Sequence, residues 1–99
     1  MYEPFNVVTG EKYNYGTVVI VLRETARDMG HLDDPRWLTK KQAEVMGRKI
    51  RPGQHGTTIS WQVVIDDKHP GHQGEKAKIT KSAVVYHASQ VTGFKIYKA

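Results

Sequence analysis

The sequence predicts one α+β domain in which a curved antiparallel sheet of three to five strands packs against two main helices on one face. Two patterns support this class. Residues 57–66 alternate between apolar and polar side chains, as a half-buried strand does. Residues 17–29 instead repeat apolar side chains at helical spacing. The chain has 99 residues, the size of a single small domain, so we treat residues 1–99 as one unit.

The opening segment, residues 1–16, has no periodic apolar pattern and is interrupted by Pro4 and Gly10, which predicts a loop. It carries four aromatic side chains: Tyr2, Phe5, Tyr13 and Tyr15. Two interpretations stay open. Either these rings hold the loop against the core, or Tyr13 or Tyr15 is a platform for a nucleic-acid base, since stacking on aromatic rings tolerates any base.

Residues 17–29 form the first predicted helix. The run Val18–Val21 is β-branched and by itself favours a strand. However, apolar side chains recur at helical spacing through Leu22, Ala26 and Met29, and charged side chains occupy much of the other side. We therefore expect a helix whose apolar side supplies much of the core.

A compact unit follows the first helix. Thr39 and Gln42 have the spacing of a capping box, which predicts a short helix of about two turns. Gly47 is placed to end that helix. Three cations lie close together after it: Arg48, Lys49 and Arg51. Glycines frame the turn at residues 53–56, so we expect the helix, the cations and the next strand to hold fixed relative positions.

The second half of the chain predicts two paired strands. Residues 57–66 are the first, and residues 79–87 are the expected antiparallel partner. The polar, glycine-containing segment 67–76 between them predicts a mobile hairpin loop. Residues 88–92 predict a short helical turn, and residues 94–97 a last strand.

The charge balance favours a polyanionic partner. Lys and Arg number 15 against 10 Asp and Glu, a formal net charge of +5, which suits nucleic acid or an anionic membrane surface. The absence of cysteine excludes disulfides, thiolate metal sites and cysteine nucleophiles. No apolar run approaches the ~18 residues of a membrane span, and the opening does not match a signal peptide. We expect a cytoplasmic protein that does not enter the membrane.

Metal binding and catalysis have weak support. His69 and His72, with Asp66, Asp67 and Glu75 nearby, form a metal-like cluster. Zinc sites need three or four ligands held rigidly, however, and this cluster lies in the predicted loop. The chain has no His-Glu-x-x-His motif and no nucleophile elbow. We expect no metal site, no cofactor and no enzymatic activity from this chain.

Four stretches of the chain resemble a known domain: NVVTGEKY, RWLTKKQA, GRKIRPGQHGTTISW and VVYHASQVTGF. Together they are similar to the N-terminal domain of ArdC-type antirestriction proteins, which also occurs in plasmid and phage polyvalent proteins. The chain departs from that family at residues 13–16, Tyr-Asn-Tyr-Gly, which hold one residue more than the family's Tyr-x-Gly. Longer members continue into a zinc-peptidase domain with a His-Glu-x-x-His helix, a motif that these 99 residues do not contain. A third interpretation is that the chain is a fragment of such a longer polypeptide. The resemblance implies binding of single-stranded DNA.

The function expected from residues and resemblance is sequence-nonspecific binding of single-stranded DNA, with RNA as a possible partner, in plasmid or phage antirestriction or in DNA transfer. The candidate residues are Arg36, Arg48, Lys49 and Arg51 for phosphates, Gln54, His55 and Thr57 for polar contacts, and Tyr13, Trp37 and Trp61 for stacking on bases. The alternative is a protein-interaction module that acts on a restriction or replication enzyme. An exposed apolar patch without DNA binding at low salt would favour that alternative.

Overall fold

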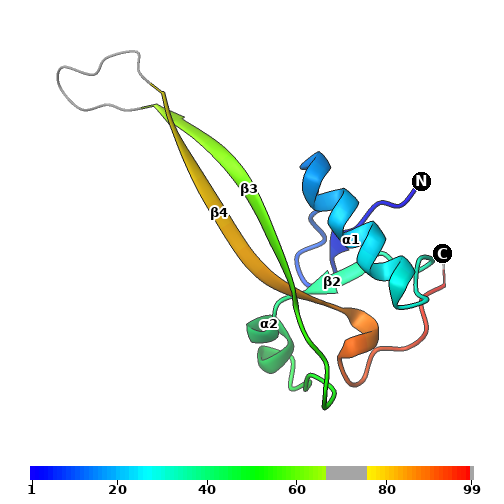
Figure 1. The fold of residues 1–99 in the computed structure, drawn as a ribbon. Coiled ribbons are helices and arrows are strands. Elements are labelled where there is room, and N and C mark those ends of the chain that lie inside the picture. Colours follow the sequence, from blue (N-terminus) through cyan, green and yellow to red (C-terminus); the bar gives the residue numbers. More distant parts are fainter. Residues whose placement is uncertain (67–75, 99) are drawn as a thin grey trace.

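The computed structural model describes residues 1–66 and 76–98. Its strands are β1 (Phe5–Asn6), β2 (Arg36–Leu38), β3 (Thr57–Asp66) and β4 (Lys76–His87). Its helices are α1 (Gly16–Asp28), α2 (Lys40–Val45) and the short 3₁₀ helix η1 (Ala88–Gln90). The predicted α+β class, curved sheet and two main helices are confirmed (Figure 1).

The four strands form one sheet in the order β1-β2-β4-β3. β3 and β4 pair antiparallel without interruption from Thr57 opposite Val85 to the end of β3, and β2 pairs antiparallel with the last residues of β4. β1 pairs parallel with β2, Phe5 lying opposite Arg36. The prediction of a wholly antiparallel sheet is therefore wrong at this edge, because the segment expected to be only loop contributes a short strand.

The two helices cover opposite faces of the sheet, not the single face expected from the sequence. Successive residues of a strand point to opposite faces, so Trp37 and Leu38 of β2 contribute to two separate cores. Trp37 packs in a cluster with Val18, Leu22 and Ala26 of α1, together with Ile59 and Val85. Leu38 packs with Ala43 of α2 and with Val91. A three-residue strand thus joins both halves of the hydrophobic core.

The cap of α2 forms as its sequence predicts. The Thr39 hydroxyl accepts a hydrogen bond from the Gln42 amide at 3.1 Å, and the Gln42 side-chain oxygen accepts one from the Thr39 amide at 3.0 Å. Gly47 follows the helix with a φ of +73°, a conformation that L side chains rarely adopt. The Gln42 oxygen also accepts from the Asn6 side chain at 2.9 Å. The cap therefore fixes the N-terminal segment as well as the helix.

Two predicted boundaries near the C-terminus are corrected. β4 begins at Lys76, before the expected start at residue 79. Residues 94–97 do not form the expected last strand. The backbone of residues 90–92 instead pairs with residues 49–51: Arg51 donates to the Gln90 carbonyl, and Thr92 donates to the Lys49 carbonyl, each at 2.8 Å. The chain after Thr92 is then held by arginine side chains, as described below.

β3 and β4 extend away from the rest of the molecule as a two-stranded ribbon (Figure 1). We call residues 61–65 with residues 77–81 the arm, and residues 1–60 with residues 82–98 the body. The two longer helices of the described chain, α1 and α2, both lie at the body end of the ribbon (Figure 1). Residues 67–75, most of the predicted hairpin loop, lie outside the described residues.

Candidate nucleic-acid interface

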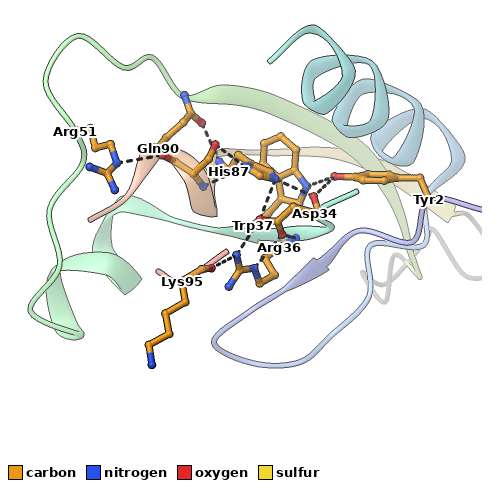
Figure 2. A network of polar contacts seen from close by, with 9 residues as sticks. Tyr2, Asp34, Arg36, Trp37, Arg51, His87, Gln90 and Lys95 are labelled. Carbon is orange, nitrogen blue, oxygen red and sulfur yellow. Dashed lines mark hydrogen bonds and ion pairs between the residues drawn. The ribbon is translucent and has the colours of Figure 1, made fainter. Parts of the chain in front are cut away.

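Trp37 is a core residue. Its side chain is 0% exposed, and its Nε1–H donates to the Tyr2 hydroxyl at 2.7 Å. The ring meets His87 edge-on, with centroids 5.0 Å apart (Figure 2). A base cannot stack on a ring that has no exposed surface, so the expectation that Trp37 binds nucleic acid is wrong. Its size and its position on β2 make it the centre of the core on the α1 side.

His87 and Asp34 form a buried polar network beside Trp37 (Figure 2). The Ser89 amide lies 3.1 Å from His87 Nδ1, and the Asp34 carbonyl oxygen lies 2.8 Å from Nε2. An amide can only donate and a carbonyl can only accept. Nδ1 is therefore the acceptor and Nε2 carries the proton, which assigns a neutral imidazole. The Gln90 side-chain oxygen accepts from the His87 amide at 2.8 Å.

The ionisation of this network follows from its burial. Burial lowers the pKa of His87, and the neighbouring Asp34 offsets this only in part. Burial acts to raise the pKa of Asp34, but the hydrogen bonds that it accepts from Arg36 outweigh burial and lower it. Burial also raises the pKa of Tyr2 to about 12. Near neutral pH the network holds a carboxylate, a neutral imidazole and a protonated phenol.

Arg36 is occupied within the body. Its Nε donates to one carboxylate oxygen of Asp34 at 2.9 Å, and one terminal nitrogen donates to the other oxygen at 2.9 Å (Figure 2). The same terminal nitrogen also donates to the Lys95 carbonyl at 2.7 Å. The side chain is 13% exposed. The ion pair and the carbonyl contact use Nε and one terminal nitrogen of the guanidinium. The structure therefore gives Arg36 a role within the body and does not favour the phosphate contact expected from the sequence.

Arg48 fastens the C-terminal segment. Its guanidinium carbon lies 4.4 Å from the centre of the Phe94 ring, and a terminal nitrogen donates to the Thr92 carbonyl at 3.3 Å. Arg36 lies over the same ring at 5.5 Å. A Cβ added at Gly93 would lie 1.9 Å from Arg48, so glycine is needed for this approach. Arg48, expected among the phosphate-binding cations, thus packs inside the body.

Lys49 and Arg51 remain exposed on the same extended segment. Ile50 forms a bridge with Val91, and exposure alternates along the segment: Arg48 and Ile50 are half-buried, whereas Lys49 and Arg51 face solvent. Arg51 keeps part of its guanidinium tied, because its Nε donates to the Ser89 carbonyl at 3.2 Å. The predicted basic corner is therefore divided, with two of its three cations at the surface.

The turn after Arg51 is closed by Gln90. The side-chain nitrogen of Gln90, Nε2, donates to the Gln54 side-chain oxygen at 3.2 Å and to the His55 carbonyl at 2.9 Å. Both side chains of the turn are exposed. A Cβ on Gly56 would lie 2.3 Å from Val84, so only glycine lets the chain pass there into β3. Thr57, the first residue of β3, is half-buried opposite Val85.

Tyr15 and Trp61 form an aromatic pair at the surface, where the body meets the arm. Their ring centroids are 6.1 Å apart and their planes are tilted by 31°. Tyr15 is 43% exposed, whereas Trp61 is half-buried against the core. Both rings line a pocket of about 270 Å³ at the junction of α1, β3 and the N-terminal segment, together with Lys12, Tyr13 and Ile59 among others. Tyr13 is packed against the core and its pKa is raised by burial.

Lys81 lies beside this aromatic pair. It is directly opposite Trp61 in the β3–β4 register, and residues directly opposite in a ladder share a sheet face. Lys78 pairs with Val64 in the same uninterrupted register and so lies on the other face. Both lysines are exposed. Of these two lysines, Lys81 is therefore placed next to the rings and Lys78 is not.

The described residues hold no group of three or more His, Cys, Asp or Glu side chains placed to bind a metal ion. The cluster around His69 and His72 falls largely within residues 67–75, outside the described part of the chain. Among the helices that the structure describes, none is long and apolar enough to cross a membrane.

Comparison with known proteins identifies the family. The sequence model of a family described as the N-terminal domain of anti-restriction factor ArdC matches residues 2–94. The chain belongs to this family. Two crystal structures of the antirestriction protein ArdC from the R388 plasmid have the same fold. The metal-free form has a TM-score of 0.72 at 28% identity, and the Mn(II)-bound form has 0.70 at 26%. These matches include 94% and 95% of this chain, but only 33% and 36% of the two ArdC chains.

Relatives of this ArdC-family domain also occur in much longer proteins. Two matches are described as the DNA primase TraC of Escherichia coli. One is 29% identical over 91% of this chain and the other 37% identical over 61%. They cover only 10% and 4% of those primases. The chain thus corresponds to a small part of each of these relatives.

The structure also brings forward two residues that the sequence alone did not rank. Tyr13 and Tyr15 were alternative platforms in the opening segment, and Tyr13 was the one named among the candidate residues. The structure pairs the Tyr15 ring with Trp61. Lys81 was one of several lysines in the second half of the chain. Its place beside Trp61 depends on the hairpin register, which fixes the face of every residue in the ribbon.

Proposed function

We propose that this chain is a non-catalytic domain that binds single-stranded DNA without sequence preference and serves antirestriction or DNA transfer. The observation that carries the proposal is the Tyr15–Trp61 ring pair at an open pocket, with Lys81 on the same sheet face. An unpaired base stacks on an exposed aromatic ring, and a neighbouring ammonium group attracts its phosphate. Membership of the ArdC family supports the antirestriction context.

Two further features support binding to a polyanion. The net charge is +5, and Lys49 and Arg51 present cations at the surface on one short segment. Neither lies in a salt bridge among the described residues. We assign them to sugar–phosphate contacts that carry no sequence information. The side chains of Gln54 and His55, exposed on the adjoining turn, are placed for polar contacts with the same strand.

The two tryptophans allow a direct test. Trp37 is fully buried and Trp61 is half-buried at the pocket, so a stacked base should change the emission of Trp61 alone. Titration with an unlabelled oligothymidylate should therefore quench part of the tryptophan fluorescence. Trp61→Phe should remove the quenching while keeping most of the affinity, because the phenyl ring still stacks.

Affinity is measured in parallel by fluorescence anisotropy with a labelled oligonucleotide. Trp61→Ala should weaken binding by ~1–3 kcal/mol, the usual contribution of one stacked base. Gln62→Ala is the matched control, since it changes the neighbouring residue on the opposite face of β3. Equal affinities for wild type, Trp61→Ala and Gln62→Ala would remove the ring pair from the site.

Partner class is tested in the same format. Single-stranded DNA, RNA of the same sequence and duplex DNA are compared at two salt concentrations. We expect the affinity for single strands to fall steeply with salt, with a slope in log–log form of about −0.7 for each phosphate contact. Absence of binding to any single strand at low salt would overturn the proposal and favour a protein partner.

A further inference from the structure

The arm has two chemically different faces. β3 and β4 pair without interruption, so residues 61, 63 and 65 share one face with residues 77, 79 and 81. This inner face is continuous with Ile59 and Val85, which pack against α1. The outer face carries Gln62, Val64, Lys78 and Thr80 over the same length.

Next to the Tyr15–Trp61 ring pair, the inner face of the arm carries a strip of apolar side chains, Val63, Ile65 and Ile79. Trp61 is followed on this face by Val63 and Ile65, and Ile79 lies directly opposite Val63. Ile65 and Ile79 are each 42% exposed. Side chains of this kind normally lie inside a core, yet here the strip passes beyond the part of the sheet that α1 covers (Figure 1). The strip therefore has free apolar surface next to the pocket of Tyr15 and Trp61.

The charge of the arm indicates what covers this strip. Residues 61–65 and 77–81 contain two lysines and no acidic residue. An uncharged protein surface would cover the apolar side chains but would leave the Lys81 ammonium group without a partner. A polymer with flat apolar units on a phosphate backbone satisfies both the strip and Lys81. The strip also ends at a recessed pocket, a shape suited to a narrow chain and not to a flat bilayer.

We propose that the inner face of the arm is a second segment of the binding site, where single-stranded DNA continues outward from the Tyr15–Trp61 platform. This inference rests on the proposed function. Bases beyond the one stacked on the ring pair lie against Val63, Ile65 and Ile79, and Lys81 contacts a phosphate where the two segments meet. The outer face stays in solvent. Contact with apolar side chains and aromatic faces does not distinguish bases, in keeping with nonspecific binding.

Two variants place the same charge on neighbouring residues of β4, one on each face. Ile79→Glu puts a carboxylate on the strip, and Thr80→Glu puts it on the outer face. Affinity is measured for oligothymidylates of about 4 and about 12 nucleotides, two lengths within the usual range of site sizes of single-strand binders. Ile79→Glu should weaken binding of the longer oligonucleotide by about tenfold or more, equivalent to about 1.4 kcal/mol. Thr80→Glu should change it by less than about threefold, since only screened, longer-range repulsion acts.

The shorter oligonucleotide separates this inference from the proposed function. It can be held by the ring pair alone, so Ile79→Glu should affect it much less than Trp61→Ala does. Equal affinities of Ile79→Glu and Thr80→Glu for the longer oligonucleotide would overturn the arm as a binding surface, even while Trp61→Ala still loses affinity. Failure of the wild type to bind either oligonucleotide would overturn the proposed function itself.

Folding is checked by thermal unfolding of each variant. Should Ile79→Glu fail to fold, Ile79→Thr keeps the β-branched shape and removes one apolar contact, and a loss of about threefold is expected for the longer oligonucleotide. Binding to anionic lipid vesicles is measured for the wild type and for Ile79→Glu. If the wild type binds vesicles and Ile79→Glu does not, while both bind DNA equally, the strip is assigned to a lipid surface and the inference is overturned.

Discussion

The body and the arm use the same kinds of residue for different purposes. In the body, Arg36 and Arg48 are held by carbonyls, a carboxylate and the Phe94 ring, and Trp37 fills the core. In the arm, Lys81 is exposed, and Trp61 is half-buried, packed against the core and tilted against the Tyr15 ring, which is 43% exposed. The comparison shows that a cation or an aromatic ring becomes available for binding only where the fold leaves its polar atoms or its face unoccupied.

The largest difference between the two regions should appear in stability. Trp37→Ala removes a fully buried ring that joins α1 to the sheet, and we expect it to lower the free energy of unfolding by about 3–5 kcal/mol. Val64→Ala, on the outer face of the arm, should lower it by less than about 0.5 kcal/mol. Urea unfolding curves of both variants measure this. Similar losses would contradict the division into body and arm.

Arg36 should behave as a structural residue. Arg36→Ala leaves the Asp34 carboxylate, which is 9% exposed, without its paired charge. Breaking such a buried pair costs about 3 kcal/mol or more. The variant should unfold at lower urea concentration, yet whatever fraction remains folded should bind single-stranded DNA with nearly wild-type affinity. A fully folded Arg36→Ala with weakened binding would instead return Arg36 to the binding site.

Acid should weaken the body through His87. Its pKa in the folded chain lies below the ordinary value of 6.5, so between these two values the unfolded chain binds more protons. Stability is thus fully present above pH 6.5 and falls as the pH drops below it. The lowered pKa of Asp34 adds a second loss below its ordinary value of 3.8.

Unfolding midpoints in urea, measured from about pH 7.5 to about pH 5, test this linkage. His87→Gln is the control: it should be less stable at every pH, but its midpoint should change little over this interval. A wild-type midpoint that is the same at both ends of the interval would contradict the assignment of a neutral, buried His87.

The smallest predicted effect concerns two lysines of the arm. Lys81→Ala should reduce the salt slope of single-strand binding by about 0.7, the value for one lost phosphate contact, while Lys78→Ala should leave it unchanged. Both substitutions remove one positive charge from β4, so the net charge is matched. Equal changes in slope would show that the two faces of the arm are not distinguished by DNA.

Much of the fold could be predicted because its signals are local. The capping box at Thr39, the glycine at the end of α2 and the alternation of β3 depend on neighbours in sequence. The parallel pairing of β1 with β2 could not be predicted, because a two-residue strand has no periodicity. The placement of α2 on the opposite face also depends on which way Trp37 and Leu38 point, and this is fixed only when β2 joins the sheet.

The candidate site was predicted less well for a related reason. Residue type made Arg36, Trp37 and Arg48 good candidates, but their partners Asp34, Tyr2 and Phe94 lie elsewhere in the sequence and only the fold brings them together. Strand alternation located Trp61 on β3, and its role in binding stays a prediction. Its neighbours Tyr15 and Lys81 depend on the packing of α1 and on the register of the hairpin, neither of which one sequence specifies.

The position of β3 at the edge of the sheet has a practical consequence. Its outer hydrogen-bonding edge pairs with no described strand, and residues 57–66 contain neither lysine nor proline, the residues that usually protect such an edge. In concentrated solution we expect a second molecule to add its own strand there. Val64→Lys should keep the purified protein monodisperse to higher concentration in light scattering, which would make it the better starting point for crystallisation.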